Sequence, residues 1–403
     1  MNTTITRAMN FLGKLLDGAD IRVVPLASVA EIARGTPITQ KSTTSGEYPV
    51  IAGGRSPAYY HNLSNRTGET IVIAGSGAYA GFVSWWDRPI FVSDAFSVHP
   101  HSGLLSKYCF YWLQGMQQEL HDLKSGGGVP HVYPHDVARL QIPIPCPESV
   151  EKSLVIQSEI VRILDELIST NSELTRQLTH EISMREKQFN DYRDRLLSFE
   201  DREVAWLTLD EVALAFGRGK SKHRPRNDPR LYGGSVPFIQ TGDIRSAFHI
   251  ITEYTQTYSD FGLKQSKLWP KGTLCITIAA NIAETGVLGF DACFPDSVIG
   301  FVANPEKTSA AYVEYLLSSF KSKLKSKSTG CAQDNINLGT FERLRLPFPP
   351  VDQQAGIVAV LDRFHALTSS IGEVLSREIV LRQSRVEYYR DLLLSVPRSA
   401  VAS

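Results

Sequence analysis

Three short segments combine residue types that could do chemistry. IVIAGSGAYAG (71–81) places glycines after an apolar run, FGRGKSK (216–222) carries two lysines in a glycine-bearing loop, and HVYPH (131–135) spaces two histidines four positions apart. Glycines of this kind let a backbone approach a phosphate or an S-adenosylmethionine cofactor, and paired imidazoles can ligate a metal. A cofactor cradle, a P-loop and a metal site therefore have to be considered first.

Each of these segments lacks the surroundings that its chemistry needs. The run after residue 81, FVSWWDRPIFV, predicts a further strand, whereas a phosphate cradle opens a helix. A P-loop would need a glycine where Leu214 stands, and Pro134 prevents the helical face that a histidine pair uses. We therefore expect a strand–turn–strand element at 71–81, no metal site, no catalytic residue and no cofactor bound by this chain; a cofactor site held by only one copy of the repeat described below is the alternative.

Basic and amide-bearing loops point instead to a polyanion. Lysine and arginine contact phosphates without reading sequence, while amide, imidazole and phenol groups can read base edges. A solvated basic surface is the alternative. The candidate DNA-binding residues are Lys41, Arg55, Tyr59, Lys124, His131, Tyr133, Arg218, Lys220, Lys222, Arg224, Arg226, Gln240, Thr241, Lys325, Lys327, Gln333, Asn335 and Asn337.

The composition limits the class of protein. Of 403 residues 42% are apolar and 21% charged, and the formal net charge is zero, so any affinity for nucleic acid must come from local patches. The five cysteines are scattered and never in CxxC spacing, which favours reduced thiols in the cytoplasm. No apolar run is long enough for a membrane span, and the N-terminal segment lacks a signal-peptide pattern.

The chain is one unit of about 190 residues written twice. REKQFNDYRDRLLSF (185–199) aligns with RQSRVEYYRDLLLSV (382–396), and the same offset continues upstream to Gln157 and Gln354. With a slightly different offset, the region around Tyr108 and Tyr111 aligns with that around Tyr312 and Tyr315. A repeat of this length predicts two domains of the same fold.

Each copy has two parts. The first is rich in glycine, aromatic and β-branched residues and predicts short strands with one helix, at 106–123 and 310–325. The second holds no proline and little glycine and predicts one long helix, on the order of 65 Å. The expected fold is α+β, with two mixed α/β domains and two long coiled-coil helices. The expected boundaries are 1–147 and 201–349 for the domains and 148–200 and 350–403 for the helices.

The long helices carry an apolar seam with alternating spacings of three and four, interrupted at the same place in both copies. We expect the seams to pack on each other; a helix that covers only its own domain is the alternative. Arg193 and Arg390 are expected off this face. The expected packing residues are Ile160, Leu164, Leu167, Leu174, Leu178, Tyr192, Leu361, Phe364, Ile371, Leu375 and Tyr389.

Taken together, the sequence resembles the specificity subunits of type I restriction–modification systems. The resemblance is carried by LPFPPVDQQAGIVAVLDRF (346–364), the YRDxLLS helix ends, VPFIQTGDI (236–244) and GCAQDNINLGTFERLRLPFP (330–349). It implies two target-recognition domains, each reading one half of a bipartite DNA site. It also implies that the two long helices run antiparallel, separate the domains and set the spacing. The first copy departs from the pattern in its connector, CPESVEKSLVIQ, and at YPVIAGG (48–54).

The resemblance also implies the partners. These are double-stranded DNA, two modification (methyltransferase) subunits that bind S-adenosylmethionine and methylate adenine, and restriction subunits that translocate and cut DNA. On this reading the chain itself is not an enzyme. A free-standing DNA-binding regulator and a methyltransferase in its own right are the two alternatives.

Overall fold

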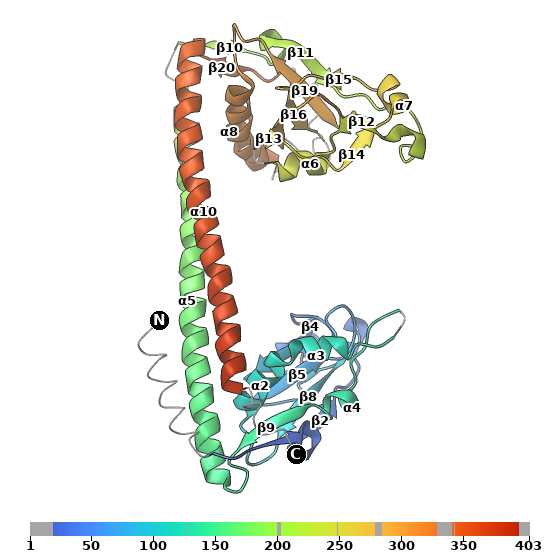
Figure 1. The fold of residues 1–403 in the computed structure, drawn as a ribbon, viewed down its shortest axis with the longest axis vertical. Helices are drawn as coiled ribbons and strands as arrows, with labels where there is room; N and C mark the ends of the chain where they lie inside the picture. Colours follow the sequence, from blue (N-terminus) through green and yellow to red (C-terminus); the bar gives the residue numbers. More distant parts are fainter. Residues whose placement is uncertain are drawn as a thin grey trace. The chain divides into compact units, whose positions relative to one another are not determined.

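The protein is described here by a computed structural model, which covers residues 19–126, 128–199, 203–247, 249–278, 284–328, 341 and 343–394. Contacts along the chain divide it into two units, residues 1–179 with 376–403 and residues 180–375. Each unit holds one mixed domain together with parts of two long helices (Figure 1). The division therefore falls inside the helices, whereas the sequence-based boundaries fall at their ends.

The first domain is built from two sheets and a strand pair. A four-stranded sheet has the order β2-β8-β5-β6, a three-stranded sheet the order β4-β3-β7, and β1 pairs antiparallel with β9. Helix α2 packs on the larger sheet. The elements are β1 Ile21–Pro25, β2 Ala30–Arg34, β3 Tyr48–Ile51, β4 Tyr59–His61, β5 Thr70–Ala74, β6 Val83–Trp86, β7 Phe91–Val92, β8 Ala95–Pro100, α2 Ser106–Gly115, α3 Gln117–Asp122, α4 Pro134–Val137 and β9 Gln141–Pro145.

The second domain repeats this plan with two additional strands. Its sheets have the orders β11-β19-β16-β17-β13 and β14-β12-β18-β15, and β10 pairs antiparallel with β20. Helix α8 packs on the larger sheet. The elements are β10 Ala205–Leu207, β11 Ala213–Arg218, β12 Tyr232–Phe238, α6 Thr241–Ser246, β13 Ile250–Ile251, β14 Gln256–Tyr258, α7 Asp260–Lys264, β15 Leu268–Trp269, β16 Leu274–Thr277, β17 Thr285–Leu288, β18 Ala292–Cys293, β19 Val298–Ala303, α8 Ala310–Ser328 and β20 Leu346–Phe348.

The shared strand order confirms the duplication that the sequence predicts. β2-β8-β5-β6 corresponds to β11-β19-β16-β17, and β4-β3-β7 corresponds to β14-β12-β18. The segment 71–81 is the expected strand and turn, because β5 leads through its glycines into the antiparallel strand β6. Gly77 and Gly81 have φ of +83° and +85°, a conformation that favours glycine, so turn geometry accounts for both.

Two long helices, α5 (Val150–Leu196) and α10 (Val351–Leu394), follow the two domains. In the first unit, the core of the domain extends onto Ile160 and Leu164 of α5 and onto Leu393 and Leu394 of α10. In the second unit, the core extends onto Leu361 of α10 and onto residues near the end of α5. Within each unit the early part of one helix thus lies with the late part of the other, which is the expected antiparallel arrangement.

The same polar contacts join each domain to the helix that follows it. Tyr108 donates a hydrogen bond to the Pro143 carbonyl oxygen (2.9 Å), and Tyr312 donates one to the Pro347 carbonyl oxygen (3.0 Å). The next tyrosine in each copy donates to a helix carboxylate, Tyr111 to Asp165 and Tyr315 to Asp362. One buried glutamine per copy, Gln157 or Gln354, completes the joint by bonding backbone groups of its domain.

Seam burial follows the prediction only in part. Ile160, Leu164 and Leu361 are buried, and Tyr192 is 40% exposed although its ring contacts that of Phe364 edge to face (5.3 Å). The remaining expected residues are half-buried: Leu167, Leu174, Leu178, Phe364, Ile371, Leu375 and Tyr389.

The expectation that Arg193 lies off the packed face is wrong. Arg193 is only 5% exposed and donates hydrogen bonds to Asn190 on its own helix and to Ser318 on α8. The end of α5 packs on the second domain, and its inward face runs from Phe189 to Arg193 and on to Leu197 just after the helix. Arg193 is thus one position after the predicted seam residue Tyr192. Arg390 of the first unit has a half-buried side chain beside Gly115.

Candidate nucleic-acid interface

Three loops of the first domain meet at one end of the β5–β6 hairpin. Ser76 and His131 form a β-bridge, the Gly77 amide donates to the Pro130 carbonyl oxygen (2.9 Å), and Lys124 Nζ donates to the Ala78 carbonyl oxygen (3.1 Å). Gly53 lies so close that a Cβ there would meet the Ser76 carbonyl oxygen at 2.3 Å. The loops at 75–82 and 124–133 are therefore hydrogen-bonded to each other, and the loop at 52–58 lies against Ser76; residue 127 is outside the described part. We call the surface of these three loops the hairpin-end surface.

Four of the predicted residues lie on this surface. The Arg55 guanidinium lies over the ring of Tyr79, 4.8 Å from its centroid, and 5.7 Å from that of Phe82. Partial burial and the nearby charges of Lys124 and Arg55 lower the pKa of His121, although Asp122 opposes them. Arg55 and Lys124 thus supply the positive charge beside His121. His131 and Tyr133 lie on the same loop as Lys124.

The two histidines of HVYPH do not converge. His131 and Tyr133 stack with ring centroids 6.0 Å apart, and Tyr133 and His135 stack at 5.5 Å. The tyrosine thus separates the imidazoles, and it is 36% exposed. This stack offers aromatic and hydrogen-bonding groups at the surface, which suits contact with bases better than ligation of a metal.

The remaining two candidates of the first domain lie on the loop before β3 and on β4. Lys41 is exposed in a single 3-10 turn, Gln40–Ser42. The Tyr59 hydroxyl donates to the Ile38 carbonyl oxygen, so it fixes that loop to the smaller sheet. Lys41 is available for a phosphate, whereas the hydrogen bond gives Tyr59 a structural role.

The basic segment of the second domain is a loop held in place by hydrogen bonds to Gln265. Arg218 ends β11, and Lys220 and Lys222 follow it, all three exposed. Gln265 Oε1 accepts hydrogen bonds from the Lys222 amide (2.6 Å) and the His223 amide (2.9 Å). Among the described residues none of these three cations has a carboxylate partner, so their charge is uncompensated locally.

The two arginines farther along the loop already bind neighbouring groups of the protein with some of their donors. Arg226 forms an ion pair with Asp296 (2.8 Å), and Arg224 donates to the carbonyl oxygens of Ser221 (2.6 Å) and His223 (2.8 Å). Both side chains are exposed. They shape the loop and can still reach an anion with their remaining donors.

Lys267 lies close to Lys220 of this basic loop and was not predicted. Its Nζ lies 3.5 Å from the centroid of Trp269, and burial together with the charge of Lys220 lowers its pKa. The neighbouring Ser266 hydroxyl donates to the Lys220 carbonyl oxygen (2.7 Å). The KLW stretch at 267–269 carries a cation and an aromatic in sequence, but only tertiary structure brings it to residues 47 positions earlier in the chain.

The other candidates of the second domain lie at the N-terminus of α6 or in parts whose side chains are outside the described residues. Gln240 is the N-cap of α6 in a capping box with Asp243, and its amide also donates to Gln256 (2.8 Å). Thr241 is the first residue of that helix and is half-buried. Lys325 and Lys327 lie on α8, but their side chains are outside the described part, as are Gln333, Asn335 and Asn337 altogether.

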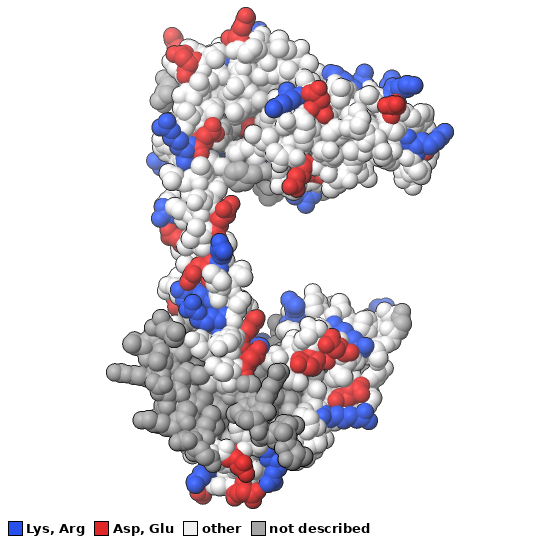
Figure 2. Space-filling model, viewed as in Figure 1, with Lys and Arg blue, Asp and Glu red and all other residues white. Residues whose placement is uncertain are grey.

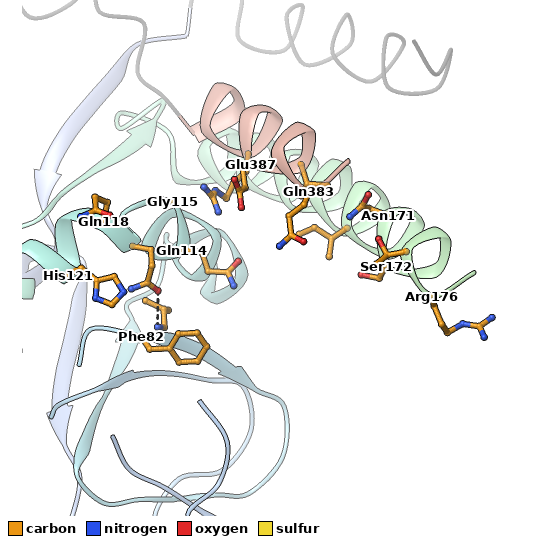
Figure 3. Close-up of a pocket in the computed structure, with 16 residues that line it drawn as sticks. Phe82, Gln114, Gly115, Gln118, His121, Asn171, Ser172, Arg176, Gln383 and Glu387 are labelled. Carbon is orange, nitrogen blue, oxygen red and sulfur yellow. Dashed lines mark hydrogen bonds between the residues drawn. The ribbon is translucent and has the colours of Figure 1, made fainter. Parts of the chain in front are cut away.

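A groove of about 840 Å³ separates α2 and α3 from the helices in the first unit (Figure 3). Gln114, Gln118 and His121 line one side, and Asn171 of α5 and Gln383 of α10 line the other. Phe82 belongs both to this groove and to the hairpin-end surface. The lining mixes amides and hydroxyls with apolar and charged side chains, which can bind a polar chain but supply no nucleophile paired with a base.

The outer face of α10 is apolar at every seventh position. Large side chains at these positions are 42% to 65% exposed: Val360, Leu367, Val374, Leu381 and Tyr388. The equivalent positions of α5 hold Ile163, which is buried, and then Thr170, Gln177, Met184 and Asp191. We call the α10 set the heptad stripe; strict seven-residue spacing is the pattern with which one helix packs on another.

On the face that Figure 2 shows, lysine and arginine are interspersed with acidic residues over each domain. No helix within the described ranges has the length and hydropathy needed to cross a membrane. The features able to bind a partner are therefore local: two cationic loop surfaces and one apolar helix face.

Comparison with known proteins shows the family to which the chain is related. The family described as type I restriction modification DNA specificity domain matches residues 19–184 and 203–379. The chain is 31% identical to the specificity subunit of the type I restriction enzyme EcoR124I/EcoR124II of Escherichia coli, over 98% of this chain and 99% of that one. It is 26% identical to the EcoprrI specificity subunit, also of Escherichia coli, over 91% and 93%.

A solved structure concerned with complex assembly and conformational transition of the type I restriction–modification system has the same fold. Its TM-score is 0.68 at 16% identity, covering 93% of this chain and 97% of that one. The two matched segments fall on the two topologically equivalent domains and extend into the helix after each. The chain belongs to the family of type I restriction–modification specificity subunits.

Proposed function

We propose that this chain is the DNA-recognition subunit of a type I restriction–modification enzyme and is itself non-catalytic. The observation that carries the proposal is the duplication: two domains of one topology present different loop chemistry at their surfaces. The first offers Arg55 and a His–Tyr–His stack, and the second a run of exposed cations from Arg218 onward. Two such domains read two unlike half-sites of a bipartite, asymmetric sequence.

The helices supply the remaining functions in this proposal. α5 and α10 each contribute to both units, so they set the gap between the half-sites, and the heptad stripe on α10 binds a helix of a modification subunit. Two modification subunits then bring S-adenosylmethionine, and restriction subunits bring translocation and cleavage. The complex works on DNA in the cytoplasm.

The test is an exchange of one domain in cells. Residues 204–349 are replaced by the corresponding domain of another specificity subunit, and the chain is co-expressed with its modification subunits. Genome-wide mapping of methylated adenine should then show a bipartite motif in which one half has changed and the other half is retained.

Loss of both halves, or retention of both, would contradict the proposal. The reciprocal exchange of residues 21–145 is the matched control, and it should change the other half. A chain that binds DNA tightly without partner subunits would instead favour a free-standing regulator.

A further inference from the structure

We propose that Arg55 reads a guanine in the DNA half-site bound by the first domain, with Tyr79 positioning it. This inference rests on the proposed function and specifies one contact of it. Among the side chains of the described residues, Arg55 combines exposure, a fixed orientation and unused donors at the hairpin-end surface.

The donors of Arg55 are free. Within the described part of the chain its guanidinium makes no hydrogen bond and no ion pair, although it lies over two aromatic rings. Lys124 on the same surface already donates to the Ala78 carbonyl oxygen. Arg66, elsewhere in the domain, is fully engaged by Ser97, Asn65 and Arg34.

The aromatic contacts explain why Arg55 suits recognition of a base and not only electrostatic attraction to phosphates. A cation held over a ring face loses fewer conformations when it binds, so recognition costs less entropy. The planar guanidinium can donate two parallel hydrogen bonds, and guanine presents O6 and N7 as paired acceptors in the major groove. A lysine at this position would contact phosphates equally well but could not make the paired bond.

The surrounding surface favours duplex DNA as the ligand. Lys124 and His121 lie near Arg55 and can approach phosphates, while the exposed Tyr133 stack lies on the adjoining loop. The loops at 75–82 and 124–133 are hydrogen-bonded to each other, and Gly53, two residues before Arg55, packs closely against the Ser76 carbonyl oxygen, so the backbone that carries Arg55 is supported. Rigid support of this kind keeps a base-reading side chain in register with the groove.

The experiment compares methylation motifs of variants in the assembled enzyme in cells. Arg55→Gln should leave the second half-site intact and reduce discrimination for guanine at one position of the first half-site by at least about tenfold. Tyr79→Leu should relax the same position to a lesser degree, whereas Tyr79→Phe retains the ring and should retain specificity.

Arg88→Gln is the matched control. Arg88 also lies over an aromatic ring, with its guanidinium 5.8 Å from the ring centroid of Trp86. It follows the end of β6, however, and so lies at the end of the β5–β6 hairpin opposite to the turn at 75–82. Its replacement should leave the motif unchanged. The half-site of the first domain is identified beforehand as the one retained when residues 204–349 are exchanged.

Three results would overturn the role of Arg55 while the proposed function stands. They are a first half-site without a G·C pair, an Arg55→Gln motif identical at every position, and a uniform loss of methylation at all sites without relaxation at one. The last would make Arg55 a phosphate contact. Absence of any bipartite motif with the unaltered chain would instead overturn the proposed function.

Discussion

Single buried polar side chains determine how each domain meets its helix. Gln354 is 1% exposed, accepts a hydrogen bond from Thr308 (2.8 Å) and donates to the carbonyl oxygens of Lys307 and Pro349 (2.8 Å each). Gln157 is fully buried and likewise bonds Leu105 and Gly103 of the first domain. Buried polar groups left unpaired cost about 1–3 kcal/mol each, so these glutamines favour one orientation of domain on helix.

A histidine pair distinguishes the second unit. His249 Nδ1 donates to Glu314 Oε2 (3.0 Å), and its ring lies 4.8 Å from that of His365, which also contacts the ring of Phe189. Burial and the charge of His249 lower the pKa of His365 against the effect of Asp362, whereas the bond to Glu314 raises the pKa of His249. The first unit has Ile168 at the position of His365.

These shifts predict a pH dependence of stability. Because the pKa of folded His365 lies below its ordinary value of 6.5, the unfolded chain takes up that proton first, and acidification through about pH 6.5 destabilises the second unit. His249 acts in the opposite sense, since its raised pKa stabilises the fold below 6.5 and that gain is lost as pH rises. His365→Ile should therefore retain more stability at about pH 5.5, relative to about pH 7.5, than the unaltered chain.

Hydrogen exchange of the α10 amides around residue 365 under both conditions measures this effect locally. His135→Ala is the control, because His135 is exposed and its removal should leave the acid sensitivity of this region unchanged. Equal acid sensitivity in His365→Ile and the unaltered chain would count against the assignment.

At the scale of elements, the heptad stripe makes α10 different from α5. Leu367 and Val374 are 63% and 65% exposed, so replacing both by glutamate should change the free energy of unfolding by less than about 1 kcal/mol. The same change puts charge into an apolar helix contact and should weaken binding of the modification subunit at least about tenfold. Analytical ultracentrifugation or calorimetry of the purified subunits measures it.

Ser376→Glu is the control for this experiment. Ser376 is exposed and follows Val374 by two residues, which places it about 200° away around the helix. The control should bind the modification subunit normally. Unimpaired binding by the Leu367→Glu, Val374→Glu double variant would exclude the stripe as the docking surface.

Repeats and periodicity predicted the elements well, because both depend on local spacing. The two domains, the long helices and the turn at 71–81 follow from such patterns. The direction in which the end of α5 faces could not be predicted from such patterns. Arg193 is buried by contacts with α8, including Ser318 125 positions later, and the spacing of apolar residues within α5 holds no information about that contact. Lys267 was missed for the same reason: its neighbours come from another part of the chain.

At the scale of the molecule, the helices can be lengthened without touching the joints. Contacts change from one unit to the other between residues 179 and 180 and between 375 and 376. Inserting seven residues at both places keeps the seam in phase and adds about 10 Å, which corresponds to about three base pairs. Methylation mapping should show both half-sites unchanged and the gap between them longer by that amount.

Insertion in α5 alone is the informative comparison, because it shifts one seam against the other and should impair folding or assembly. A double insertion that folds, methylates and leaves the gap unchanged would refute the role of the helices as spacers. The recognised bases themselves could not be predicted from the sequence, since they depend on loop geometry such as the stacking of Arg55 on Tyr79.

The matching joints have a consequence for how the genes that encode such chains can diversify. Tyr108 and Tyr312, Gln157 and Gln354, and Asp165 and Asp362 make matching contacts, so a domain encoded at one position carries the attachment points required at the other. Recombination with breakpoints in the DNA that encodes the helices would then exchange whole domains, each with its own contacts to the helices. A new DNA specificity then arises from a single crossover, without a new fold.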